Sequence, residues 1–176
     1  MFTGDLLGLP IPDAGPVFTA ALTIHVATAL TAVVSGALAA TAHKGSGRHP
    51  RAGRVYLWAL SGTAASATIM AATRWQHDAH LFVMGALASV LGWYGYRVRR
   101  RHRPGWPLGH GVGMAGSYVV LVTAFYVDNG PFLPVWSRLP HVSYWLLPSI
   151  VGIPATWIAL RRYTRRPRQM EPSAQG

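Results

Sequence analysis

The chain has 176 residues and no cysteine, and 51% of it is hydrophobic while only 12% is charged. A soluble domain usually carries about a quarter charged residues, so this chain lacks the charge needed to cover a water-facing surface. We therefore predict an integral membrane protein. The absence of cysteine excludes disulfides, iron–sulfur clusters, thiolate zinc sites and cysteine nucleophiles.

Five apolar segments are long enough to cross a membrane. A helix needs about 20 apolar residues to span the hydrocarbon core. In chain order the segments cover residues 17–41, 55–73, 79–97, 108–127 and 142–160. They predict an all-α fold, a bundle of five transmembrane helices over residues 17–162. Residues 1–16 are predicted to be an extracytoplasmic lead-in, and residues 163–176 a basic, disordered cytoplasmic tail.

The basic residues indicate how the bundle lies in the membrane. Fourteen of the 16 Lys and Arg residues lie between the first two spans, from Arg97 at the end of the third span to Arg103, or from Arg161 after the fifth span onward. Because short Lys/Arg-rich loops stay in the cytoplasm, we predict that the N-terminus faces out and the C-terminus faces in. The same distribution explains the net charge of +11 without a nucleic-acid partner. The expected partners are the lipid bilayer and anionic headgroups at its cytoplasmic face.

Small residues recur at helical spacing and predict close helix–helix contacts. They are Ala29, Ala32, Gly36 and Ala40 in the first span, Gly62 and Ser66 in the second, and Gly109, Gly113 and Ser117 in the fourth. Ordinary packing within the bundle explains these patterns more simply than a dedicated dimer motif does.

Eight histidines in so apolar a chain are its most suggestive chemical feature. His25 lies about 12 Å below the outer end of the first span, by the helical rise per residue. An ionisable group at that depth is costly and usually faces the bundle interior. His110 lies just inside the inner end of the fourth span. The two are about 20 Å apart along the bundle axis.

Histidines at these depths suggest haem, because neutral imidazole is an axial ligand of haem iron. One haem cannot bridge His25 and His110. An outer haem b would pair His25 with His80, His77 or His141, and an inner one would pair His110 with His49 or His102. The alternative is that these histidines only make hydrogen bonds within the bundle. Zinc is less favoured, because His77 and His80 have no third ligand other than Asp78, which points elsewhere.

These observations give one leading functional hypothesis and two alternatives. The leading hypothesis is a haem b redox or electron-transfer protein, with iron ligands among His25, His80 and His110. The first alternative is a non-enzymatic assembly or interaction protein that binds another membrane protein. A small-solute transporter is less favoured, since no Asp or Glu lies within a predicted span. The chain shows no nucleophile–base constellation, so we predict no catalytic residue and lean against an enzyme.

Between the first two spans the chain has the sequence His49-Pro50-Arg51-Ala52-Gly53-Arg54-Val55-Tyr56. This run resembles His-Arg-x-x-Gly-Arg-x-Tyr, the signature of a family of small bacterial multi-helix membrane proteins of unknown function. Pro50 stands where the signature has Arg, and Arg51 follows one step later. In that family a histidine on the first helix and another that opens a later helix accompany the signature, matched here by His25 and His110.

The resemblance implies a multi-pass protein of the bacterial cytoplasmic (inner) membrane, and it supplies no activity. It singles out the cofactor-site candidates His25, His49, Arg54, Tyr56 and His110. One hypothesis is that Arg54, His49 and His110 form a polar site at the inner mouth of the bundle. The guanidinium of Arg54 would there bind an anionic group such as a haem propionate or a lipid phosphate. The alternative is that Arg54 only anchors the helix end and obeys the charge rule.

Overall fold

Five long helices make up most of the protein. The computed structural model describes residues 2–6, 9–12, 15–43, 47–102 and 104–165. The helices are α1 (Gly15–Thr41), α2 (Arg48–Thr73), α3 (Trp75–Arg101), α4 (Trp106–Asn129) and α5 (Val142–Arg165). A short antiparallel hairpin of β1 (Phe2–Leu6) and β2 (Leu9–Pro12) precedes them. Two single 3₁₀ turns, η1 (Gly130–Phe132) and η2 (Trp136–Arg138), connect α4 to α5.

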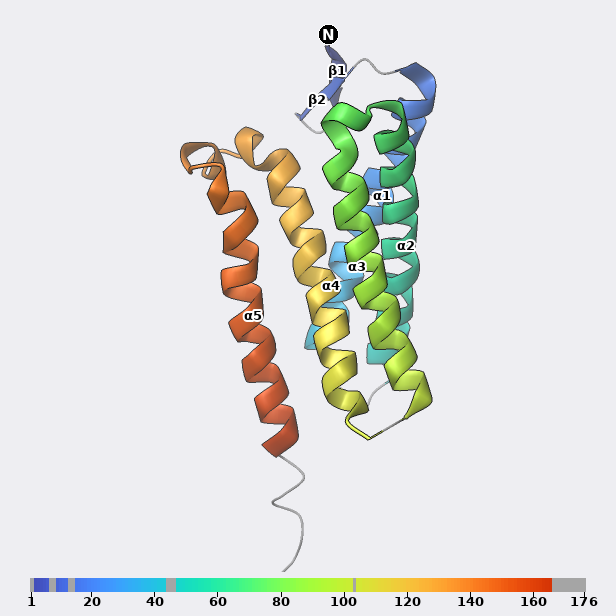
Figure 1. The fold of residues 1–176 in the computed structure, drawn as a ribbon, viewed down its shortest axis with the longest axis vertical. Coiled ribbons are helices and arrows are strands. Elements are labelled where there is room, and N and C mark those ends of the chain that lie inside the picture. The colour runs from blue at the N-terminus through green and yellow to red at the C-terminus, as the bar shows by residue number, and fades with distance from the viewer. Residues whose placement is uncertain (1, 7–8, 13–14, 44–46, 103, 166–176) are drawn as a thin grey trace, which may run out of the picture.

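The helices form a four-helix bundle with a fifth helix at its side. Each helix packs on its neighbour in sequence, and α1 also meets α4, so that α1 to α4 enclose a common core. Figure 1 shows α5 lying along α4, outside this bundle. The buried residues of one core cluster are small or aliphatic apart from one tyrosine: Ala32, Tyr56, Ala59, Leu60, Ala88 and Leu121.

The prediction of an all-α protein with five spans is confirmed. All five helices are long and apolar enough to cross a membrane. Large apolar side chains also point outward along them: Trp58 is 68% exposed, Val90 66% and Val151 67%. Such side chains are stable on the outside of a helix bundle when lipid surrounds it, so the protein is an integral membrane protein whose helices contact the bilayer.

The helices extend beyond the predicted apolar runs. Helix α2 begins at Arg48, seven residues before the expected start of the second span at Val55. It includes Pro50, because a backbone N–H in the first turn of a helix has no hydrogen-bond acceptor within that helix, so the N–H that proline lacks is not needed there. Helix α3 runs on to Arg101 through the basic run that was expected to form a link. The hairpin of β1 and β2 lies within the region predicted only as a lead-in. Helix α5 ends at Arg165, and the rest of the predicted tail lies outside the described residues.

The small residues form the expected close contacts between helices. A Cβ atom on Gly62 would lie 3.0 Å from Cγ2 of Thr28, so α1 and α2 approach closely there. A Cβ atom on Gly36 would lie 2.6 Å from the ring of Tyr118, which joins α1 to α4. The closest approach to a backbone atom is between α3 and α4, where a Cβ atom on Gly113 would lie 2.8 Å from the backbone of Gly95. This contact brings the start of α4 against the end of α3.

Candidate functional site

Two of the predicted histidines meet at one end of the bundle. His49 lies in the first turn of α2 and His110 in the second turn of α4. Their ring centroids are 6.2 Å apart, and the ring planes are nearly perpendicular, at 80°. Of the two inner pairings predicted for His110, the structure therefore brings His49 to it. We call His49 and His110 the inner histidine pair.

Backbone carbonyls place a hydrogen on Nδ1 of both rings in this pair. Nδ1 of His49 lies 2.8 Å from the carbonyl oxygen of Ala39 at the end of α1. Nδ1 of His110 lies 3.0 Å from the carbonyl oxygen of Gly95 in α3. A carbonyl oxygen can only accept, so in each ring Nδ1 carries the hydrogen and donates it. In the neutral imidazole the lone pair is then on Nε2, which is the usual second-shell arrangement of a metal-ligating histidine.

The other predicted partner of His110 lies one aromatic ring further away. The ring of His102 packs against Trp106, with centroids 5.6 Å apart, and Trp106 in turn lies 6.4 Å from His110. Arg99 lies over the same indole, 5.7 Å from its centroid. Trp106 therefore separates His102 and its basic neighbours from the inner histidine pair.

Tyr56 lies on the same face of α2 as His49, because seven residues are nearly two helical turns. Its ring is buried, 2% exposed, and its hydroxyl lies 2.7 Å from the hydroxyl of Ser117 on α4. Ser117 in turn donates to the carbonyl of Met114, so the hydroxyl of Tyr56 can donate to Ser117. Tyr56 thereby links α2 to α4 in the core.

Arg54 lies on a different face of α2 from the inner histidine pair. It is two residues from Tyr56, which is about 200° around the helix, and its side chain is exposed. There it lines a groove against α1 together with Thr28 and Thr31. The structure thus brings His49 and His110 together and places Arg54 elsewhere.

His25 contacts α2 in the outer half of the bundle. Its Nδ1 lies 3.2 Å from both the carbonyl oxygen of Thr63 and the hydroxyl of Ser66. Ser66 uses its own hydrogen toward the backbone of α2, so His25 donates to both oxygens. The expected interior position of His25 follows from these contacts, and its Nδ1–H has the same role as in the inner pair.

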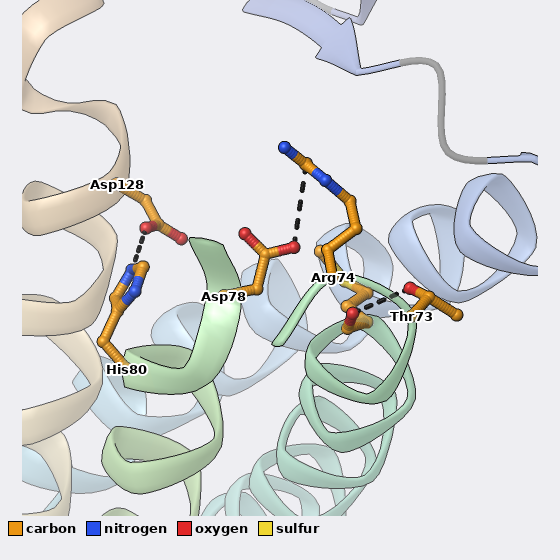
Figure 2. Close-up of polar contacts among 6 residues, drawn as sticks. Thr73, Arg74, Asp78, His80 and Asp128 are labelled. Carbon is orange, nitrogen blue, oxygen red and sulfur yellow. Dashed lines mark hydrogen bonds and ion pairs between the residues drawn. The ribbon is translucent and has the colours of Figure 1, made fainter. Parts of the chain in front are cut away.

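A second polar cluster lies at the opposite end of the bundle from the inner pair (Figure 2). Nε2 of His80 on α3 lies 2.6 Å from a carboxylate oxygen of Asp128 at the end of α4. Arg74 lies 3.7 Å from Asp78 one turn along α3, and Figure 2 shows Asp78 between Arg74 and Asp128. The candidate residues predicted from the sequence do not include Asp128. The available signal was that a histidine and an aspartate fall at the same level of two adjacent antiparallel helices.

The contacts of His80 differ from those of a typical iron ligand. Because Nε2 of His80 points to Asp128, it is already occupied in this arrangement. Within the described ranges of the chain, no group of three or more His, Asp or Glu side chains could hold a metal ion. Any metal chemistry based on these residues would therefore need ligands from outside the protein.

Comparisons with protein families, curated proteins and solved structures gave no match to this chain. The resemblance to the bacterial membrane family therefore depends on the signature from His49 to Tyr56 and the matching His25 and His110, and it stays a prediction.

Proposed function

We propose that this protein binds one haem b at the inner histidine pair and transfers electrons in the bacterial cytoplasmic membrane. The observation that carries the proposal is the pairing of His49 and His110, from two different helices, with each Nδ1–H donating to a backbone carbonyl. This hydrogen bonding orients an imidazole and raises the basicity of its Nε2, as is usual for histidines that bind metals.

The number of histidines suits haem better than a free metal ion. A structural zinc site needs four protein ligands and a catalytic one three, whereas haem supplies four nitrogens itself and needs only axial ligands from the protein. His49 and His110, whose ring centroids lie 6.2 Å apart, would hold the haem iron through their Nε2 atoms. When bound, the haem would supply reversible one-electron chemistry.

An absorption spectrum of the detergent-purified, full-length protein from haem-replete cells tests this proposal. We expect a Soret band and, after reduction with dithionite, the sharp α and β bands of iron with two histidine ligands. A correctly folded, monodisperse protein that shows no Soret band even after haem supplementation would reject it.

An interaction role is the second candidate, and helix α5 supports it. Large apolar side chains are exposed along this helix, which packs beside the bundle on α4: Val142, Leu146, Ile150, Val151, Ile153, Trp157 and Ile158. Lipid covers such a face in a membrane, and so would a helix of another membrane protein. The absorption spectrum distinguishes the two candidate functions, because an interaction role needs no cofactor.

We also propose how the protein is oriented across the membrane. The ends of α1, α3 and α5 and the starts of α2 and α4 lie at one end of the molecule, and they carry most of the basic residues. We expect reporter fusions after Gly47, after His102 and at the C-terminus to be cytoplasmic, and a fusion at Gly130 to be extracytoplasmic. A cytoplasmic reporter at Gly130 would overturn the proposed orientation.

A further inference from the structure

A groove runs along the outer surface of α1 and α2, away from the inner histidine pair. It has a volume of about 550 Å³ and is lined by Thr28, Thr31, Arg54, Val55, Trp58 and Ala59. Val55 is 50% exposed and Trp58 68% exposed, so the groove opens to the surrounding lipid.

The wall of the groove is effectively apolar although two threonines line it. The hydroxyl of Thr28 donates to the carbonyl of Ile24 at 2.8 Å. The hydroxyl of Thr31 donates in the same way to the carbonyl of Ala27, also at 2.8 Å. Both hydroxyls are therefore satisfied by their own helix, and Val55 and Ala59 complete the wall. A hydrocarbon chain suits such a wall, and a polar solute does not.

One end of the groove carries a positive charge, the guanidinium of Arg54. Arg54 directly precedes Val55, where the apolar run of the second span begins, so it lies at the depth of the lipid headgroups. In the part of the chain that the structure describes, the guanidinium of Arg54 has neither a hydrogen-bond nor an ion-pair partner. A planar guanidinium at this depth can bind a lipid phosphate through two parallel hydrogen bonds.

We infer that this groove binds an anionic phospholipid, with its phosphate on Arg54 and an acyl chain along Val55, Ala59 and the two threonines. The occupant must be amphiphilic, because the groove joins a single cation to an apolar wall. The exposed indole of Trp58 lies one turn from Arg54, and tryptophan is enriched at the depth where headgroups meet chains. This inference is independent of haem binding, since Arg54 lies on a different face of α2 from His49.

Native mass spectrometry of the full-length protein in detergent tests whether the charge of Arg54 selects an anionic lipid. The probes are phosphatidylglycerol and phosphatidylcholine with identical acyl chains. We expect the wild type to prefer phosphatidylglycerol about fivefold, which is the effect of one Arg near an anionic headgroup. Arg54→Gln should abolish this preference. Arg51→Gln is the matched control, because it removes the same charge from an exposed position of α2 that does not line the groove.

A second pair of variants tests the groove itself. Thr31→Phe fills part of the groove and should weaken phosphatidylglycerol binding severalfold. Leu30→Phe adds an aromatic ring to a neighbouring exposed position of α1 outside the groove and should leave binding unchanged. Inorganic phosphate at the same concentration should not displace the lipid, because it lacks a chain. Equal binding of the two lipids to the wild type, equal loss in Arg51→Gln and Arg54→Gln, equal effects of the two Phe variants, or displacement by phosphate would each overturn the inference.

Discussion

Replacing either His49 or His110 by alanine is expected to remove the two-histidine spectrum completely. Each variant leaves at most one axial ligand, so the sharp α and β bands of the reduced haem should disappear and most of the haem should be lost on purification. Absorption spectra at equal protein concentration measure this loss. Added imidazole should restore the sharp bands in both variants, because free imidazole can bind the iron in place of the deleted histidine ring. A merely structural role of the histidines would not be rescued in this way.

Two control variants distinguish the inner site from its alternatives. His102→Ala should keep the spectrum, because Trp106 separates His102 from the inner pair. His25→Ala should also keep it, since His25 makes its contacts with Thr63 and Ser66 in the outer half of the bundle. Loss of haem in His25→Ala, with retention in His49→Ala and His110→Ala, would move the site to the outer half and contradict the inner assignment.

The fold could largely be predicted from the sequence because the bilayer imposes a minimum length on each apolar run. Outside the bilayer this constraint does not apply, and local features of the sequence decide where each helix begins and ends. The apolar run of the second span starts at Val55, but the helix extends back to Arg48 because Pro50 is tolerated in a first turn. The arginines at the end of α3 likewise continue the helix, since nothing there breaks it before His102, which has a left-handed backbone with φ 44°.

The candidate site was only partly predictable. Helical rise places His49 and His110 at the same end of the bundle, but whether His49 or His102 meets His110 depends on how α2, α3 and α4 pack. Helical rotation could have separated Arg54 from this pair. Tyr56 lies on the same face of α2 as His49, and Arg54, two residues from Tyr56, must point to a different side. The pairing of Tyr56 with Ser117 joins residues 61 positions apart, and no local pattern indicates it.

The contact between α3 and α4 should be the most sensitive packing feature of the bundle. A Cβ atom on Gly113 would lie 2.8 Å from Cα and N of Gly95 and from the carbonyl oxygen of Leu91. All three are backbone atoms, which cannot rotate away as a side chain can. Gly113→Ala therefore forces the helices apart, and we expect it to lower the free energy of unfolding by about 1–3 kcal/mol, the usual cost of overpacking.

The same displacement should reach the inner histidine pair. The carbonyl of Gly95 accepts the hydrogen bond from His110 at 3.0 Å, so moving α4 away from α3 lengthens the bond that orients this ring. Gly116→Ala is the matched control on α4, because its Cβ atom would lie 3.5 Å from a side-chain methyl of Leu91, an ordinary contact. Unfolding in detergent, followed by size-exclusion chromatography across a temperature series, compares the two variants with the wild type. Gly113→Ala should unfold at a clearly lower temperature, while Gly116→Ala should match the wild type or exceed it, since alanine favours a helix more than glycine does. Equal unfolding temperatures for the two variants would show that α3 and α4 do not depend on backbone contact at Gly113.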